Sequence, residues 1–93
     1  MGNQTCCQIL VTGKVQGVLF RKYAKITALL LGIKGFVRNE RDGSVYIEAA
    51  GDKVQVDKLI EWCHRGPKHS EVKKVEVTEI PFKKFEGFGI EGF

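Results

Sequence analysis

The chain has 93 residues, of which 43% are hydrophobic and 28% are charged, and its formal net charge is +4 at pH 7. This length fits one small domain with a single two-layer core, and the composition excludes collagen-like, disordered and coiled-coil chains. The longest apolar run, residues 28–31, is far shorter than the roughly 20 residues of a membrane-spanning helix, and the start of the chain is too polar for a secretory signal. We therefore expect a cytoplasmic protein that does not enter a membrane.

The first half of the chain predicts a strand, a helix and a two-stranded hairpin. The first strand is short and β-branched, and a loop with two glycines follows it. Apolar residues then recur with the period of a helix from Phe20 until Gly32, which ends the helix. The next two strands flank an Asp-Gly pair, which is a strong signal for a hairpin turn. The expected ranges are 7–12 for the first strand, 13–18 for the loop, 20–31 for the helix, and 34–38 and 44–50 for the hairpin strands.

The second half of the chain predicts a helix and two more strands. Asp52 can cap the helix, and Gly66 with Pro67 can end it. A fourth strand is expected over residues 72–80, where Pro81 ends it, and a short final strand over residues 88–93. The apolar stripe expected on the helix consists of Val56, Leu59, Ile60 and Cys63.

The order of these elements predicts the fold class. Two helices that alternate with strands in the order βαββαβ must cover one face of the sheet. We expect an α+β protein with a ferredoxin-like βαββαβ sandwich, an antiparallel sheet with two helices on one face, and a short extra C-terminal strand. A single domain is expected over residues 1–93, with residues 1–6 as a loose N-terminal tail.

The cysteines and histidines do not have the spacing of a metal site. Cys6, Cys7 and Cys63 are odd in number and lack a CxxC motif, and His64 and His69 are poorly placed to complete a zinc site. We expect reduced, partly buried thiols, although a bridge from Cys6 or Cys7 to Cys63 is compatible with the sequence. No metal and no cofactor are expected.

The segment between the first strand and the first helix has the layout of an anion-binding cradle. Backbone N–H groups of a glycine-containing loop can form a concave nest, and the first N–H groups of a helix have no partner within the helix. The helix dipole adds partial positive charge at the same place. Arg21 at the helix start could add two parallel, charge-assisted hydrogen bonds to a phosphate. The spacing of Gly13 and Gly17 alone also fits a tight turn with a surface arginine.

Two longer motifs resemble the signatures of the acylphosphatase family. Residues 11–21 read VTGKVQGVLFR and resemble the first signature, apolar-x-G-x-V-Q-G-V-x-F-R. Residues 35–45 read GFVRNERDGSV and, with Gly51, resemble the second signature. Between them, ALLLGI at residues 28–33 is similar to the A-x-x-L-G-L of the family. The resemblance extends from about residue 7 to about residue 93.

The resemblance implies an enzyme that hydrolyses acyl phosphates to a carboxylate and inorganic phosphate without a metal. Arg21 matches the catalytic arginine of the family, and Asn39 matches the asparagine that orients the attacking water. The implied partners are a small acyl phosphate and phosphate, and we expect a monomer that binds no nucleic acid. The implied phosphate-binding residues, through their amides, are Val15, Gln16, Gly17, Val18, Leu19, Phe20 and Arg21.

Two other classes of function share some of these features. RNA-recognition modules have the same fold, and KGFV at residues 34–37 matches the start of their strand motif, but residues 38–40 are not the aromatic or apolar residues that the motif requires. The second alternative is a catalytically silent domain that binds a partner or carbamoyl phosphate, and the presence of Arg21 and Asn39 argues against it.

The sequence does not decide where the acyl group binds or whether the chain associates with itself. No defined pocket for the acyl group is evident. A second apolar row on the first helix gives the hypothesis of a weak self-association surface; its members are Ile26, Leu29, Leu30 and Ile33.

Overall fold

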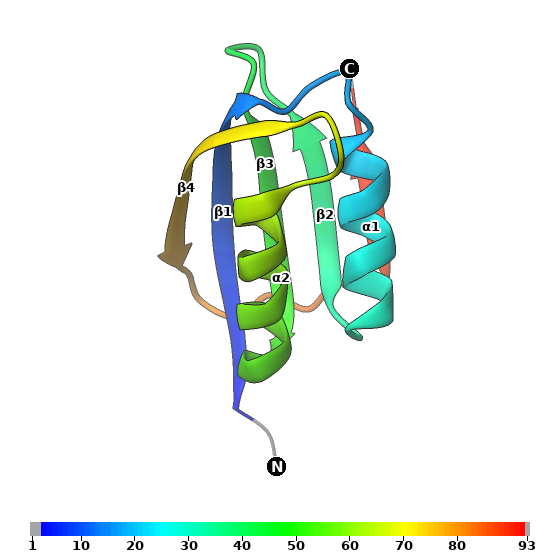
Figure 1. Cartoon of the computed structure of the whole chain (residues 1–93). Helices are drawn as coiled ribbons and strands as arrows, with labels where there is room; N and C mark the ends of the chain where they lie inside the picture. Colours follow the sequence, from blue (N-terminus) through cyan, green and yellow to red (C-terminus); the bar gives the residue numbers. More distant parts are fainter. Residues whose placement is uncertain (1–2, 93) are drawn as a thin grey trace.

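The computed structural model describes residues 3–92 and shows five strands and two helices. The sheet has the order β4-β1-β3-β2-β5, and α1 and α2 lie side by side on one of its faces (Figure 1). This arrangement confirms the ferredoxin-like sandwich with an added C-terminal strand. The elements are β1 (Gln4–Lys14), α1 (Phe20–Leu30), β2 (Lys34–Asn39), β3 (Val45–Asp52), α2 (Lys53–Arg65), β4 (Glu71–Glu79) and β5 (Phe88–Glu91).

The added strand makes the sheet mixed rather than antiparallel. The β1–β3, β1–β4 and β2–β3 pairs are antiparallel, as expected, whereas β5 pairs with β2 in parallel. The segment at residues 80–87 crosses from the β4 edge to the opposite edge near the end at which β4 finishes (Figure 1). The strand β5 must therefore run opposite to β4, and that is the direction of β2.

The N-terminal strand is longer than its sequence pattern predicts. Gln4 pairs with Asp52, and Cys6 is buried, so the expectation of a loose tail is wrong for residues 4–6. Backbone pairing with β3 orders these polar residues, because the ladder uses N–H and C=O groups whatever the side chain is. Residues 1–2 of the expected tail and residue 93 of the expected last strand lie outside the described residues.

The core lies between the sheet and the two helices. Alternate strand residues such as Ile9, Val37 and Ile47 are fully buried against the helices. The first helix contributes the small residues Ala24 and Ala28 to this core, which lets it lie close to the sheet. As predicted, the Asp52 side chain accepts a hydrogen bond from the N–H of Val54 at 3.1 Å, and α2 ends at Gly66.

All three cysteines are buried free thiols in the structure, as expected. Burial raises the pKa of Cys7 to about 11 and the pKa of Cys63 to about 12. The thiols of Cys7 and Cys63 therefore stay protonated at neutral pH, where a thiolate would be the reactive species.

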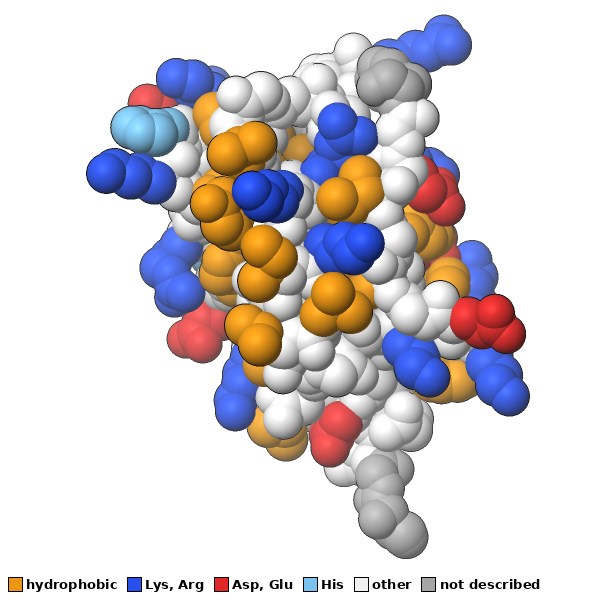
Figure 2. All heavy atoms as spheres, turned by 90° about the vertical axis from the view of Figure 1, so that its right-hand side faces the viewer, with side chains coloured by type: hydrophobic (Ala, Val, Ile, Leu, Met, Phe, Trp, Pro, Cys, Tyr) orange, Lys and Arg blue, Asp and Glu red, His pale blue; other side chains and the backbone are white. Residues whose placement is uncertain are grey.

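The outer side of α1 carries exposed hydrophobic side chains (Figure 2). In the predicted second apolar row, Leu30 is 83% exposed and Leu29 is 54% exposed, whereas Ile33 is buried in the core. Self-association through this row stays a hypothesis. No helix within residues 3–92 is long and apolar enough to cross a membrane.

A buried carboxylate stabilises the face of the sheet that the helices leave open. Glu48 accepts hydrogen bonds from the Tyr46 hydroxyl at 2.6 Å and from the Lys83 ammonium at 2.9 Å, and Lys83 belongs to the crossing segment. Burial raises the pKa of Glu48, but these hydrogen bonds outweigh burial and hold the pKa below its ordinary value. The contact ties residues 80–87 to the sheet and so helps to place β5.

This carboxylate predicts an acid-sensitive contribution to stability. Because the folded pKa lies below the ordinary value of 4.5, the contribution of Glu48 is present above about pH 4.5 and is lost as the pH falls through the folded pKa. We expect Glu48→Gln to lower the free energy of unfolding at pH 7 and to differ less from the wild type below about pH 4. Urea denaturation across this range measures the difference. Glu86→Gln, an exposed change in the same segment, is the control, and an equal loss at both pH values would contradict the prediction.

A glycine in β2 allows that strand to pair closely with β3. Gly35 has φ +144°, and a Cβ atom there would overlap the carbonyl oxygen of Glu48. We expect Gly35→Ala to lower the free energy of unfolding by about 2–3 kcal/mol, because both the conformation and the space exclude a side chain. Gly89→Ala on the adjacent β5 should change it by less than about 1 kcal/mol, because a Cβ there meets open space. Equal denaturation midpoints for the two variants would count against this account.

Candidate active site

The glycine loop between β1 and α1 turns sharply into the helix. Gly17 has φ +76°, and Leu19, the N-cap residue of α1, has φ +65° and ψ +25°. A left-handed conformation at leucine is unfavourable by about 1–2 kcal/mol, and such strain gathers at functional sites. Leu19 is 59% exposed, so burial of its side chain does not explain the conformation.

The first turn of α1 has backbone N–H groups without hydrogen-bond partners and two cationic side chains. Within residues 3–92, the backbone N–H groups of residues 17–22 donate no hydrogen bond to a backbone carbonyl of a loop or helix cap. The N-cap side chain makes no capping hydrogen bond, and the first turn contains no acidic residue. Arg21 and Lys22 instead add positive charge at the positive end of the helix dipole, which is unfavourable by about 0.3–1 kcal/mol each. A bound anion would relieve both effects.

The Arg21 side chain is held by the C-terminal strand. Its Nη1 donates a hydrogen bond to the carbonyl oxygen of Glu91 at 3.1 Å. A Cβ atom at Gly92 would lie 2.6 Å from the same nitrogen, so glycine leaves the guanidinium room. The added β5 therefore does more than extend the sheet, because it orients the arginine beside the loop.

Asn39 comes to the same place from a different strand. It is the last residue of β2 and pairs with Val45. Its side chain lies on the same side of the strand as that of the buried Val37, which is the side that the helices cover. A hollow of about 300 Å³ brings Asn39 together with Arg21 at the first turn of α1; its lining residues are Val15, Gly17, Leu19, Phe20, Arg21, Lys22, Asn39 and Ile90.

The side chain of Gln16 does not line this hollow but fixes the loop in place. Its Nε2 donates to the carbonyl oxygens of Glu40 at 2.7 Å and of Ser44 at 2.9 Å. Both acceptors belong to the turn that follows Asn39. Gln16 thus couples the position of the loop to the end of β2, and so to Asn39.

The turn that receives Gln16 is itself well ordered by hydrogen bonds. The Asp42 carboxylate accepts from the hydroxyl of Ser44 at 2.6 Å and from its N–H at 2.9 Å, and these bonds lower the pKa of Asp42. The N–H of Glu40 donates to the Ser44 carbonyl at 2.8 Å. Ser44 therefore links the hairpin turn to the loop.

The remaining predicted loop residues have separate structural roles. Val15 and Phe20 are 1% exposed and anchor the two ends of the loop in the core. The Phe20 ring meets Trp62 of α2 edge-on, with 5.0 Å between centroids. Val18 lines a neighbouring hollow rather than the one with Arg21.

Comparison with known proteins places this chain in a family. The acylphosphatase family model matches residues 7–90. The chain belongs to the acylphosphatase family. An acylphosphatase of Acaryochloris marina is 46% identical over 90 residues, with 97% of each chain covered. This membership confirms the family and the enzyme class that the two motifs predict.

Solved acylphosphatase structures have the same fold. The acylphosphatase from Coxiella burnetii superposes with a TM-score of 0.93 at 35% identity, covering 96% of this chain and 94% of that one. The acylphosphatase from Bacillus subtilis superposes with a TM-score of 0.91 at 31% identity, covering 96% and 99%.

Sequence reasoning missed two residues of the hollow. Lys22 directly follows the arginine of the first motif, so its place in the first helical turn was available as a signal. Ile90 reaches the hollow only because β5 pairs with β2, and no local pattern shows this. Within the described residues, no three His, Cys, Asp or Glu side chains come together as a metal site.

The two hydrogen bonds of Gln16 predict a coupled loss of stability and anion affinity. We expect Gln16→Met to lower the free energy of unfolding by about 1–2 kcal/mol, because two hydrogen bonds are lost while each carbonyl keeps one backbone N–H donor. The affinity for inorganic phosphate, measured by calorimetric titration, should fall about tenfold as the loop loosens. Thr12→Val removes a side-chain bond to the Lys74 carbonyl elsewhere on β1 and should leave phosphate affinity unchanged. Unaltered affinity in Gln16→Met would refute the coupling.

Proposed function

We propose that the hollow at the first turn of α1 binds the phosphoryl group of an acyl phosphate and hydrolyses it to a carboxylate and inorganic phosphate. The observation that carries this proposal is the meeting of Arg21, Asn39 and the unpartnered N–H groups of Gly17 and residues 19–22 at one hollow. These groups come from two parts of the chain, the loop at the start of α1 and the end of β2, and have complementary chemistry.

The loop and Arg21 hold the phosphoryl group. Backbone N–H groups from Val15 to Arg21 supply the donors of the cradle, and the dipole of α1 adds to their attraction for a dianion. The Arg21 guanidinium donates to two phosphoryl oxygens and stabilises the negative charge that they carry in the transition state. Its hydrogen bond to Glu91 sets the direction from which it approaches.

Asn39 positions the attacking water. Its carbonyl oxygen accepts a hydrogen bond from the water, and its amide group donates to a phosphoryl oxygen. Asparagine cannot remove a proton at neutral pH, so its contribution is orientation. The two hydrogen bonds of Gln16 keep Asn39 and the phosphate loop at a constant separation.

The reaction needs little from the protein beyond position and charge. The water oxygen forms a bond to phosphorus, and the bond between phosphorus and the bridging oxygen breaks. The carboxylate leaves with the electron pair, and the proton of the water passes to a phosphoryl oxygen. Because a carboxylate is already a good leaving group, positioning and electrostatic stabilisation are sufficient to accelerate the step.

The aromatic residues on the sheet face that the helices leave open favour a small-molecule substrate over nucleic acid. The aromatic rings there are Phe36 and Tyr46, and the Arg38 guanidinium lies 5.7 Å and 4.6 Å from their centroids. Phe85 meets Phe36 edge-on at 6.1 Å. Protein groups thus occupy positions that stacked bases would need. The absence of nucleic-acid binding, the monomeric state and the cytoplasmic location stay predictions of the sequence.

Substitution of the two polar residues tests the mechanism. In excess EDTA, we expect the wild type to hydrolyse benzoyl phosphate and Arg21→Ala to lose about 10³-fold in kcat/KM. Arg21→Lys should recover only part of this, because lysine cannot make the paired hydrogen bonds. Asn39→Ala should lose about 10²-fold, mainly in kcat, as the water is no longer oriented.

The controls for this test separate folding from chemistry. Arg41→Ala removes an exposed arginine of the neighbouring turn and should keep wild-type activity. Circular dichroism should show the same fold in every variant. A folded wild type without hydrolysis in EDTA would contradict the proposal and favour a silent binding domain.

A further inference from the structure

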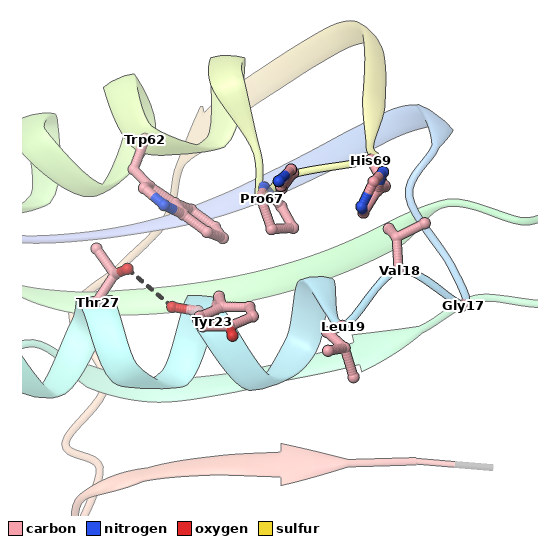
Figure 3. Close-up of a pocket in the computed structure, with 9 residues that line it drawn as sticks. Gly17, Val18, Leu19, Tyr23, Thr27, Trp62, Pro67 and His69 are labelled. Carbon is pink, nitrogen blue, oxygen red and sulfur yellow. Dashed lines mark hydrogen bonds between the residues drawn. The ribbon is translucent and has the colours of Figure 1, made fainter.

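A second, larger hollow lies on the other side of the phosphate loop. It has a volume of about 700 Å³, lies between the start of α1 and the segment that follows α2, and opens to solvent (Figure 3). Its walls include Val18, Tyr23, Thr27, Trp62 and Pro67. These residues come from the loop, from α1 and from α2 with its following turn, so the hollow exists only in the folded chain.

The walls of this hollow are mainly apolar, although it is open to solvent and Lys68 and His69 also line it. Trp62 and Pro67 form one side, and Val18 and Tyr23 form the other (Figure 3). The edge contact with Phe20 holds the indole in place. An apolar cleft with few polar groups is typical of a site for a small organic ligand.

This hollow is continuous with the phosphate site. Gly17 and Leu19 line both hollows. A Cβ atom at Gly17 would meet nothing within 4 Å, so the space beside this shared residue is open. In an acyl phosphate, only the bridging oxygen separates phosphorus from the carbonyl carbon. The rest of the acyl group must therefore lie directly beside the phosphoryl group, within reach of the larger hollow.

We propose that the larger hollow binds the acyl group of the substrate, and that the enzyme prefers acyl phosphates with an aromatic or similarly large apolar acyl group over acetyl phosphate. This inference rests on the proposed function, because it takes the phosphoryl group to lie beside Arg21. Trp62 and Pro67 contact the apolar group, and Gly17 lets it cross the loop.

A different exit from the phosphate site would select a different substrate. A hollow on the far side of Asn39 is lined by Arg38, Glu40, Arg41 and Asp42, all of them charged. An acyl group in that direction would have to be polar. Because Lys68 also lines the larger hollow, the direction is decided by the substrate preference together with a variant inside that hollow.

The test compares substrates that share the reaction and differ in the acyl group. The substrates are acetyl phosphate, 3-phenylpropanoyl phosphate and succinyl phosphate, with each kcat/KM divided by the uncatalysed rate. We expect the phenylpropanoyl substrate to exceed acetyl phosphate by about tenfold or more, as apolar contacts in a pocket produce. Succinyl phosphate should show no such gain, and a preference for it would overturn the inference.

A pair of variants on α1 localises the effect. Thr27→Trp places an indole in the larger hollow, away from Arg21 and Asn39. This variant should lower kcat/KM for phenylpropanoyl phosphate about tenfold and leave kcat/KM for acetyl phosphate within about twofold of the wild type. Ile26→Trp, one residue away and outside the hollow, should change neither. An equal loss for both substrates in Thr27→Trp would overturn the inference.

Fluorescence gives a readout that does not depend on turnover. Trp62 is the single tryptophan of the chain and lines the hollow. A non-hydrolysable acylphosphonate with a phenylpropanoyl group should change its emission at saturation, whereas inorganic phosphate alone should not. Unchanged emission with the acylphosphonate bound, shown by competition with phosphate in calorimetry, would overturn the inference.

The outcomes separate the acyl site from the proposed function. Hydrolysis of all three substrates without discrimination would leave the function intact and remove the acyl site. A folded wild type that hydrolyses none of them would remove the proposed function and, with it, the acyl site that rests on it.

Discussion

The unpartnered start of α1 is the constraint around which the site is arranged. A helix that begins at a left-handed leucine, without a capping side chain or an acidic first turn, leaves N–H groups and two cations facing the same hollow. Such a terminus is unfavourable in an empty protein and favourable with a dianion in place. In the proposed function, the same feature that lowers the stability of the helix start supplies the affinity for phosphate.

Elements distant in sequence give this terminus the geometry on which the proposed function rests. Gln16 joins the loop to the turn after β2, the end of β2 presents Asn39, and a β5 carbonyl holds Arg21. The sheet order makes these contacts possible, since β2 lies between β3 and β5. The rigidity of the sheet is thus transmitted to the loop through a few hydrogen bonds. Phosphoryl transfer depends on this, because most of its acceleration comes from position and charge.

The opposite wall of the loop has a different character. Val18 points toward the segment after α2, and Trp62 and Pro67 close an apolar hollow beside it (Figure 3). One short loop therefore separates the polar hollow proposed for the phosphoryl group from the mainly apolar hollow proposed for the acyl group. Gly17 and Leu19 line both hollows, whereas Val18 lines only the apolar one and Arg21 only the polar one.

Local patterns in the sequence predicted the elements, the cradle and the two polar residues. Strand and helix periods, the Asp52 cap and the Asp-Gly turn depend on neighbours within a few residues, so they are visible in the chain itself. The resemblance of residues 11–21 and 35–45 to family signatures predicted Arg21 and Asn39 for the same reason. What only the tertiary structure decided is the direction of β5, the hold of Glu91 on Arg21, the hydrogen bonds of Gln16 and the hollow beside Trp62. Each of these joins residues that are far apart in the chain, and packing of the helices and the crossing segment against the sheet brings them together.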